Sequence, residues 1–226
     1  MKKRIICFGD SNTWGYNPTN GSRFDENTRW PMVLQKLLGD DYQIIEEAQN
    51  GRTIANADPW EWGCKCGMDY ILPMLESHKP FDLLIIMLGS NDLKAKFHLP
   101  AGDIAGSLQN MLMKAKSFLQ YQCAISPKIL IVSPPYLGEN LKSSPFAPFF
   151  DVDSAIETSR QMAYWYELVA KQFDCDFLDA ATICKAGDVD SLHLMEDGHR
   201  QLAEAIFQKV SGDGSNGVKL RNQSSV

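Results

Sequence analysis

Four short polar segments of the sequence carry the residue types of an acyl-transfer site. In chain order they are Gly9-Asp10-Ser11-Asn12, Asn50-Gly51-Arg52, Gly89-Ser90-Asn91-Asp92 and Asp190-x-x-His193. A serine hydrolase needs a nucleophile, a general base, a group that orients the base, and donors for an oxyanion. Because the four segments supply all of these groups, the sequence predicts an enzyme with a serine nucleophile.

Ser11 is the predicted nucleophile because it closely follows the apolar run Arg4–Phe8. A residue just after a parallel strand lies at the carboxyl edge of the sheet, where backbone N–H groups favour a developing negative charge. The rival interpretation is a plain turn, because every residue from Gly9 to Asn12 favours turns. The sequence contains no Gly-x-Ser-x-Gly, which argues against the nucleophile elbow of an α/β-hydrolase.

His193 is the predicted general base, and Asp190 is the predicted partner that orients it. Both belong to segment 187–194, whose composition is typical of a loop. An aspartate that accepts from one imidazole nitrogen sets the tautomer and leaves the other nitrogen to take the serine proton. Asp188 and Asp197 are the alternative orienting residues.

The other histidines fit structural or surface positions. His199 falls at helical spacing with Leu202 and Ile206, which predicts a packed position on the last helix. His78 and His98 have no partner pattern in the sequence, so we expect both at the surface.

Asn91 and Gly51 are the predicted oxyanion donors, together with the backbone N–H of Ser11. The Asn91 amide follows the apolar run Leu83–Leu88 and can reach across the sheet edge. Gly51 lacks a side chain and can therefore present its N–H close to a substrate. A simple turn is the alternative at both positions. We expect Asp92 to cap or brace its loop and to take no part in the chemistry.

The apolar runs predict a three-layer α/β/α sandwich on a five-stranded parallel sheet. The predicted strands are Arg4–Phe8, Tyr42–Glu47, Leu83–Leu88, Ile129–Ser133 and Cys175–Leu178. The predicted helices are Trp30–Leu38, Met68–Ser77, Asp103–Gln120, Ser154–Phe173 and Glu196–Val210. Short apolar strands without alternation are typical of a parallel sheet covered on both faces, and strands that alternate with helices indicate a doubly wound fold.

Three long connections, 13–29, 52–67 and 134–152, are rich in aromatic residues. Long loops in a compact domain are usually functional, and this end of a parallel sheet is where ligands bind. The pattern predicts a pocket wall, and we assign substrate contacts to Trp14 and Phe150. Packing between subunits is an equally weighted alternative.

Composition indicates one globular domain, residues 1–211, followed by a flexible tail, 212–226, rich in Gly, Ser and Asn. A net charge of −6 offers no basic stripe for nucleic acid. No apolar stretch is long enough to span a membrane, and the run after Arg4 is shorter than the core of a secretory signal. We therefore expect a cytoplasmic protein. Cys64-x-Cys66 has no second Cys or His pair nearby, so we expect no metal.

The combined segments resemble the SGNH, or GDSL, hydrolase superfamily. Its four characteristic residues match Ser11, Gly51, Asn91 and His193. The stretches Phe8–Gly15, Ile85–Lys94 and Val132–Pro135 look most similar to the bacterial arylesterase branch, which includes acyltransferase and perhydrolase enzymes.

The resemblance covers the chain from Arg4 to about Val210. Asn12 stands where the family usually has Leu or Ile, and we expect this departure to alter local packing and not the triad. The resemblance implies a flavodoxin-like fold, an acyl-serine intermediate, no cofactor and, as in some relatives, a homo-oligomer.

The expected function is therefore hydrolysis of short-chain, acetyl-like and aryl esters, with a small-molecule ester as the substrate. A narrow, dry pocket would also let alcohols or peroxide compete with water for the acyl group. A carbohydrate acetylesterase or deacetylase of the same superfamily is the alternative. A non-catalytic binding module would be expected to have lost one of the site residues, and a nucleotide binder would need a glycine-rich phosphate motif that the sequence lacks.

Overall fold

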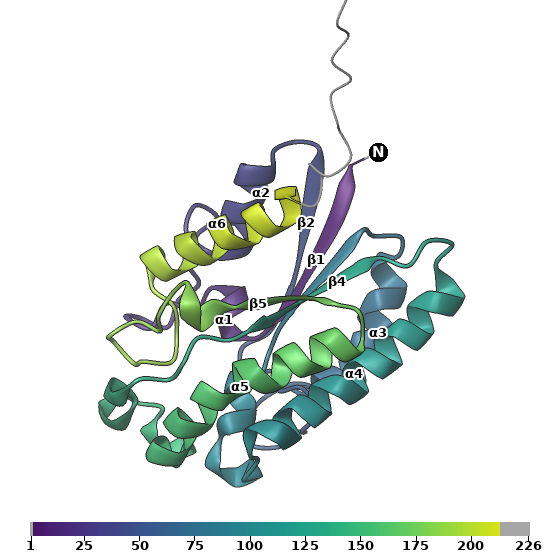
Figure 1. Ribbon diagram of the computed structural model, residues 1–226. Coiled ribbons are helices and arrows are strands. Elements are labelled where there is room, and N and C mark those ends of the chain that lie inside the picture. Colours follow the sequence, from purple (N-terminus) through teal and green to yellow (C-terminus); the bar gives the residue numbers. More distant parts are fainter. Residues whose placement is uncertain (1, 213–226) are drawn as a thin grey trace, which may run out of the picture.

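The computed structural model describes residues 2–212, so the predicted tail from 213 onward lies outside the described residues. Its centre is one parallel sheet with the strand order β2-β1-β3-β4-β5 (Figure 1). The strands are β1 Lys3–Gly9, β2 Tyr42–Ala48, β3 Leu83–Met87, β4 Lys128–Ser133 and β5 Asp176–Asp179. This sheet confirms the predicted fold class, and each strand lies within a residue or so of its predicted position.

Helices cover both faces of the sheet. The longer ones are α2 Trp30–Leu38, α3 Gly67–His78, α4 Ala101–Gln122, α5 Val152–Gln172 and α6 Glu196–Gly212. Helices α2 and α6 pack together on one face, and α3, α4 and α5 pack on the other (Figure 1). Helix α6 therefore includes Gly212, the residue at which the tail was predicted to begin.

Alternate strand residues supply two separate hydrophobic cores. Ile6 and Phe8 of β1 belong to the larger core, which includes residues of α3, α4 and α5. Their neighbours Ile5 and Cys7 belong to the smaller core, beside Trp30 of α2 and residues of α6. Because both faces of the sheet are buried, the strands need apolar residues at successive positions, which explains the continuous apolar runs in the sequence.

A single helical turn, α1 Ser11–Trp14, follows β1 directly. The side chain of Asp10 caps it by accepting from the backbone N–H of Asn12 at 3.0 Å. It ends at Gly15, whose φ of 87° is in the left-handed region that favours glycine. The aspartate cap and the terminal glycine are the sequence signals of this unpredicted turn, which sets Ser11 at the carboxyl edge of the sheet.

Candidate active site

Ser11, His193 and Asp190 form one chain of hydrogen bonds. Oγ of Ser11, at the start of α1, is 2.9 Å from Nε2 of His193. On the other side of the ring, Nδ1 of His193 is 2.6 Å from Oδ2 of Asp190. All three residues are buried. The fold thus brings together the predicted nucleophile, base and orienting residue, although the serine is some 180 residues away from the other two in the chain.

Hydrogen bonds favour the ionised form of Asp190. Burial alone would raise its pKa, but bonds from the His193 ring and from the backbone N–H groups of His193 and Leu192 hold the pKa below its usual value. A carboxylate that accepts from Nδ1 keeps the proton on that nitrogen, so Nε2 can accept from Ser11.

The alternative orienting residues lie away from the ring. Asp188 is exposed, and Asp197 pairs with Arg200 at 3.0 Å on the surface of α6. Of the three aspartates considered from the sequence, Asp190 is the one that contacts His193.

His199 is a packed structural residue, as predicted. It is completely buried, and its Nδ1 accepts from the backbone N–H of Trp30 at 3.3 Å. Burial, and then the neighbouring His193, lower the pKa of His199 to about 3, so the ring is neutral near pH 7. It therefore serves as a hydrogen-bond acceptor at the start of α2.

The sequence shows no partner pattern for His78, but the structure gives this residue a partner. Its Nε2 lies 2.6 Å from Oε1 of Glu47, and its side chain is only a quarter exposed. The partner comes from the end of β2, and the sequence separation of 31 residues hides the pair from any local pattern. His98 is exposed, as expected.

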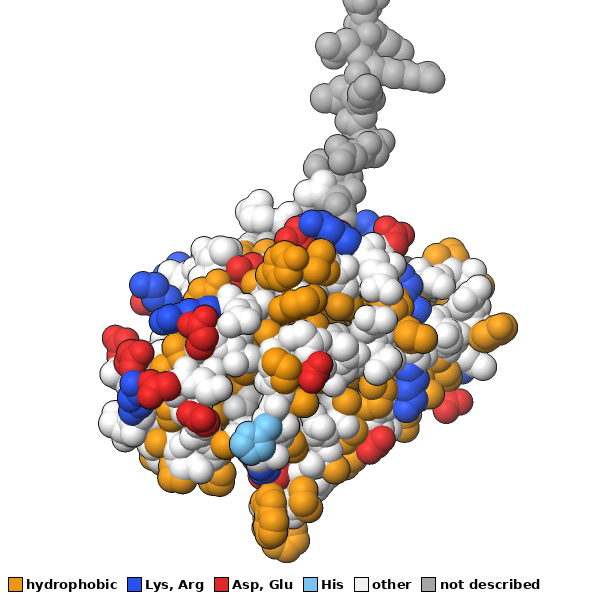
Figure 2. Space-filling model, turned by 60° about the horizontal axis from the view of Figure 1, so that its bottom comes forward, with side chains coloured by type: hydrophobic (Ala, Val, Ile, Leu, Met, Phe, Trp, Pro, Cys, Tyr) orange, Lys and Arg blue, Asp and Glu red, His pale blue; other side chains and the backbone are white. Residues whose placement is uncertain are grey.

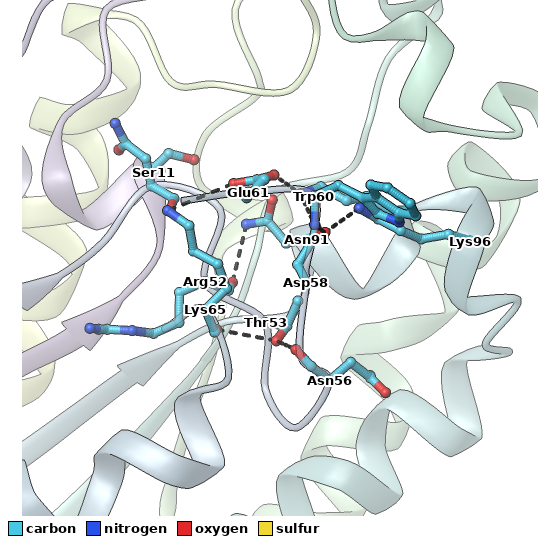
Figure 3. Close-up of polar contacts among 12 residues, drawn as sticks. Ser11, Arg52, Thr53, Asn56, Asp58, Trp60, Glu61, Lys65, Asn91 and Lys96 are labelled. Atoms are coloured by element: carbon cyan, nitrogen blue, oxygen red, sulfur yellow. Dashed lines mark hydrogen bonds and ion pairs between the residues drawn. The ribbon is translucent and has the colours of Figure 1, made fainter. Parts of the chain in front are cut away.

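The three predicted oxyanion donors lie after β1, β2 and β3. The Asn91 amide donates to the carbonyl of Arg52 at 3.1 Å, which orients the amide and leaves its second hydrogen (Figure 3). Within residues 2–212, the backbone N–H groups of Ser11 and Gly51 have no acceptor. Gly51 has a φ of 79°, a conformation that favours glycine. Such donors can stabilise a negatively charged oxygen.

A carboxylate that was not predicted lies directly against Gly51. A Cβ atom at Gly51 would lie only 1.9 Å from Oε2 of Glu61. The other oxygen of Glu61 pairs with Lys94, whose Nζ is also 3.1 Å from Oδ2 of the buried Asp58. Glu61 and Asp58 are labelled in Figure 3. Because an unpaired carboxylate would oppose an oxyanion, pairing with lysine suits this position.

Glu61 belongs to an ionic cluster that joins two loops. Its members are Asp58, Glu61, Lys65, Lys94 and Lys96. The first three lie in the long connection after β2, and the two other lysines follow Asn91. The charges were visible in the sequence, but their pairing across more than 30 residues was not.

Two aromatic rings contact His193. The ring centroid of Tyr16 is 4.4 Å and that of Phe146 is 5.2 Å from the centroid of the imidazole. Both come from long aromatic connections that were predicted to form a pocket wall, but neither was chosen as a substrate contact. The structure places Phe150 instead in the larger core at 8% exposure, and Trp14 under the guanidinium of Arg23.

Residues 2–212 contain no group of three or more His, Cys, Asp or Glu side chains that could hold a metal ion. In the same range, no helix has the length and apolar character needed to cross a bilayer.

A buried Ser–His–Asp chain at the carboxyl edge of a flavodoxin-like sheet defines an α/β serine hydrolase. Residues 7–201 match the family model described as GDSL-like lipase/acylhydrolase. The chain belongs to this family, and it is a carboxylic ester hydrolase of the SGNH type. No curated protein matches it.

Solved structures agree with this assignment. The aryl esterase of M. smegmatis is 33% identical with a TM-score of 0.85, and the match covers 93% of this chain and 99% of that chain. A carbohydrate acetylesterase family member from Sinorhizobium meliloti is 34% identical with a TM-score of 0.85, covering 93% and 98%. A lipase/acylhydrolase from Enterococcus faecalis, 16% identical with a TM-score of 0.63, shares the fold.

Proposed function

We propose that the protein hydrolyses short-chain carboxylic esters, including aryl esters, through an acyl-serine intermediate. The observation that carries this proposal is the hydrogen-bonded chain from Ser11 through His193 to Asp190. It contains a nucleophile, a base in reach of the nucleophile's proton, and a carboxylate that orients the base. The likeness to an aryl esterase supports the inclusion of aryl esters among the substrates.

Acylation begins when Nε2 of His193 takes the proton of Ser11 as Oγ attacks the ester carbonyl. The resulting oxyanion accepts from the N–H groups of Ser11 and Gly51 and from the Asn91 amide. His193 then protonates the leaving alcohol, and a water molecule, activated by the same nitrogen, hydrolyses the acyl-serine. Asp190 stays ionised throughout and stabilises the imidazolium.

The rings of Tyr16 and Phe146 support a preference for short acyl groups. Both pack against His193, so they limit the space beside the base. The same rings shield the acyl-serine from bulk water, which favours transfer of the acyl group to an alcohol or to peroxide. Turnover of p-nitrophenyl esters of increasing acyl length tests this preference; a maximum at long chains would contradict it.

The first experiment compares p-nitrophenyl acetate hydrolysis by the native protein, Ser11→Ala and His193→Ala. Ser22→Ala, a change of an exposed serine in the following loop, is the matched control. We expect turnover to fall to a small residual level in the first two variants and to persist in the control. Equal turnover in all four proteins would overturn the proposal and revive a non-catalytic binding module.

A carbohydrate acetylesterase is the second candidate. Trp60 and Trp62 are 81% and 97% exposed in the connection that also carries Glu61, and tryptophan faces can stack on sugars. The Sinorhizobium meliloti neighbours are named as carbohydrate acetylesterases. Acetate release from acetylated sugars and from aryl acetates, compared as kcat/KM, distinguishes the two; Trp60→Ala should lower only the sugar reaction if this candidate is correct.

We also propose a homo-oligomer. Hydrophobic side chains project from the end of the molecule in Figure 2, and several large ones are exposed elsewhere on the surface. Exposed apolar surface often marks an interface between subunits. Light scattering on the purified protein at several concentrations gives its mass directly. A monomer mass at every concentration would contradict the proposal.

A further inference from the structure

The side chain of Asn12 binds the backbone on both sides of His193. Its Nδ2 donates to the carbonyl of Leu192 at 3.2 Å, and its Oδ1 accepts from the N–H of Leu194 at 2.8 Å. The asparagine is 2% exposed, so these bonds are shielded from water. The Asn12 amide therefore supplies the donor and the acceptor that a neighbouring strand would supply to the segment around His193.

The remaining peptide groups around His193 are held by other residues of its own loop. Asp190 accepts from the N–H groups of Leu192 and His193, at 3.0 and 2.9 Å. The N–H of Gly187 donates to the carbonyl of His193 at 2.7 Å. Among the partners of these peptide groups in residues 2–212, Asn12 is the one that lies beside the nucleophile, some 180 residues away in the sequence.

Asn12 also lies next to the nucleophile, on the same helical turn. Its backbone N–H donates to the buried carboxylate of Asp10, which fixes the turn that presents Ser11. One residue thus links the segment that carries Oγ to the segment that carries Nε2. The contacts of Asn12 therefore extend beyond the local packing expected from the sequence.

We propose that Asn12 is a positioning residue that sets the distance between Oγ of Ser11 and Nε2 of His193. The proposal rests on the proposed roles of those two residues. A leucine at position 12, usual in the family, cannot replace either bond and would leave two buried backbone groups unpaired. The loop would then relax, and a displacement of about 1 Å costs on the order of a hundredfold in turnover.

The first test is Asn12→Leu, assayed on p-nitrophenyl acetate. We expect kcat to fall about a hundredfold with little change in KM, because the substrate contacts remain in place. Thr13→Val is the matched control. Thr13 lies on the same turn and is fully buried, and its hydroxyl has no hydrogen-bond partner in residues 2–212. The kcat of the Thr13→Val variant should therefore stay unchanged.

A double-mutant cycle separates positioning from a general structural role. If Asn12 acts through His193, then adding Asn12→Leu to His193→Ala should not lower the residual turnover further. An equal loss in both backgrounds would identify a structural role and overturn the proposal. An unchanged kcat for Asn12→Leu in the native background would overturn it as well.

A second variant is available in case Asn12→Leu does not fold, and a separate readout tests the esterase proposal itself. If thermal unfolding shows that Asn12→Leu does not fold, Asn12→Asp takes its place in the same cycle, since it keeps the acceptor for Leu194 and loses the donor for Leu192. Failure of the esterase proposal is recognised separately, because Ser11→Ala and His193→Ala would then retain full turnover.

Discussion

Asp92 accepts from the backbone N–H of Ile54 with both carboxylate oxygens, at 3.0 and 3.1 Å. This contact joins the loop after β3, which carries Asn91, to the loop after β2, which carries Gly51. As predicted, Asp92 braces its loop. It also holds two proposed oxyanion donors in a fixed relation.

Replacing Asp92 should change how stability depends on pH. Burial raises the pKa of Asp92 to about 7, although bonds from Ile54 and Asn56 oppose the rise. The folded pKa lies above the unfolded value of about 4, so this group stabilises the fold below pH 4 and that contribution is lost as the pH rises through 7.

Asp92→Asn removes this titration. We expect the free energy of unfolding of the variant, relative to the native protein, to rise by about 2–3 kcal/mol between pH 5 and pH 8. Urea unfolding at both pH values measures this difference. Asp10, whose pKa burial raises to about 6, titrates in both proteins, and its charge adds to the rise in the pKa of Asp92. A difference that is the same at both pH values would contradict the prediction.

Asn91→Ala should lower kcat on p-nitrophenyl acetate by about a hundred- to thousandfold, because an oxyanion donor acts mainly in the transition state. The control is Asn140→Ala, which removes an exposed amide that binds the carbonyl of Asp188. If kcat falls by less than about threefold, Asn91 does not stabilise the oxyanion.

Asp190→Asn should lower kcat by about ten-thousandfold while the fold is retained, because an amide favours the wrong tautomer of His193. Asp188→Asn, the change of a rival candidate from the sequence, should leave kcat unchanged. Steady-state kinetics of the two variants decide between them: a large loss in Asp188→Asn, or none in Asp190→Asn, would refute the assignment.

Lys94→Met should destabilise the ionic cluster. The side chain of Asp58 is fully buried, and it would keep Lys96 and the backbone N–H of Trp60 as partners. Removing one partner of a buried pair costs about 3 kcal/mol at the low end of the usual range. Urea unfolding of Lys171→Met, which breaks the exposed pair with Glu167, is the control and should show less than about 1 kcal/mol. An equal, small effect in both variants would contradict the prediction.

The sequence by itself determined the fold class and the order of the elements. The apolar runs of β1 and β3 identify buried parallel strands because each strand packs on both faces. The polar residues directly after those strands, Ser11 and Asn91, had to meet at one edge, since parallel strands end together. Local spacing was also enough to place His199 on the packed face of α6.

Only the tertiary structure decided which groups touch. Phe146, and not the predicted Phe150, contacts His193. Glu61 pairs with Lys94, and Asn12 bonds to the loop of His193. Each of these contacts joins segments that are far apart in the chain. Spacing along the sequence reports the face of a helix or strand on which a residue lies. It does not report how two loops approach each other, because that depends on the packing of the sheet and helices that carry them.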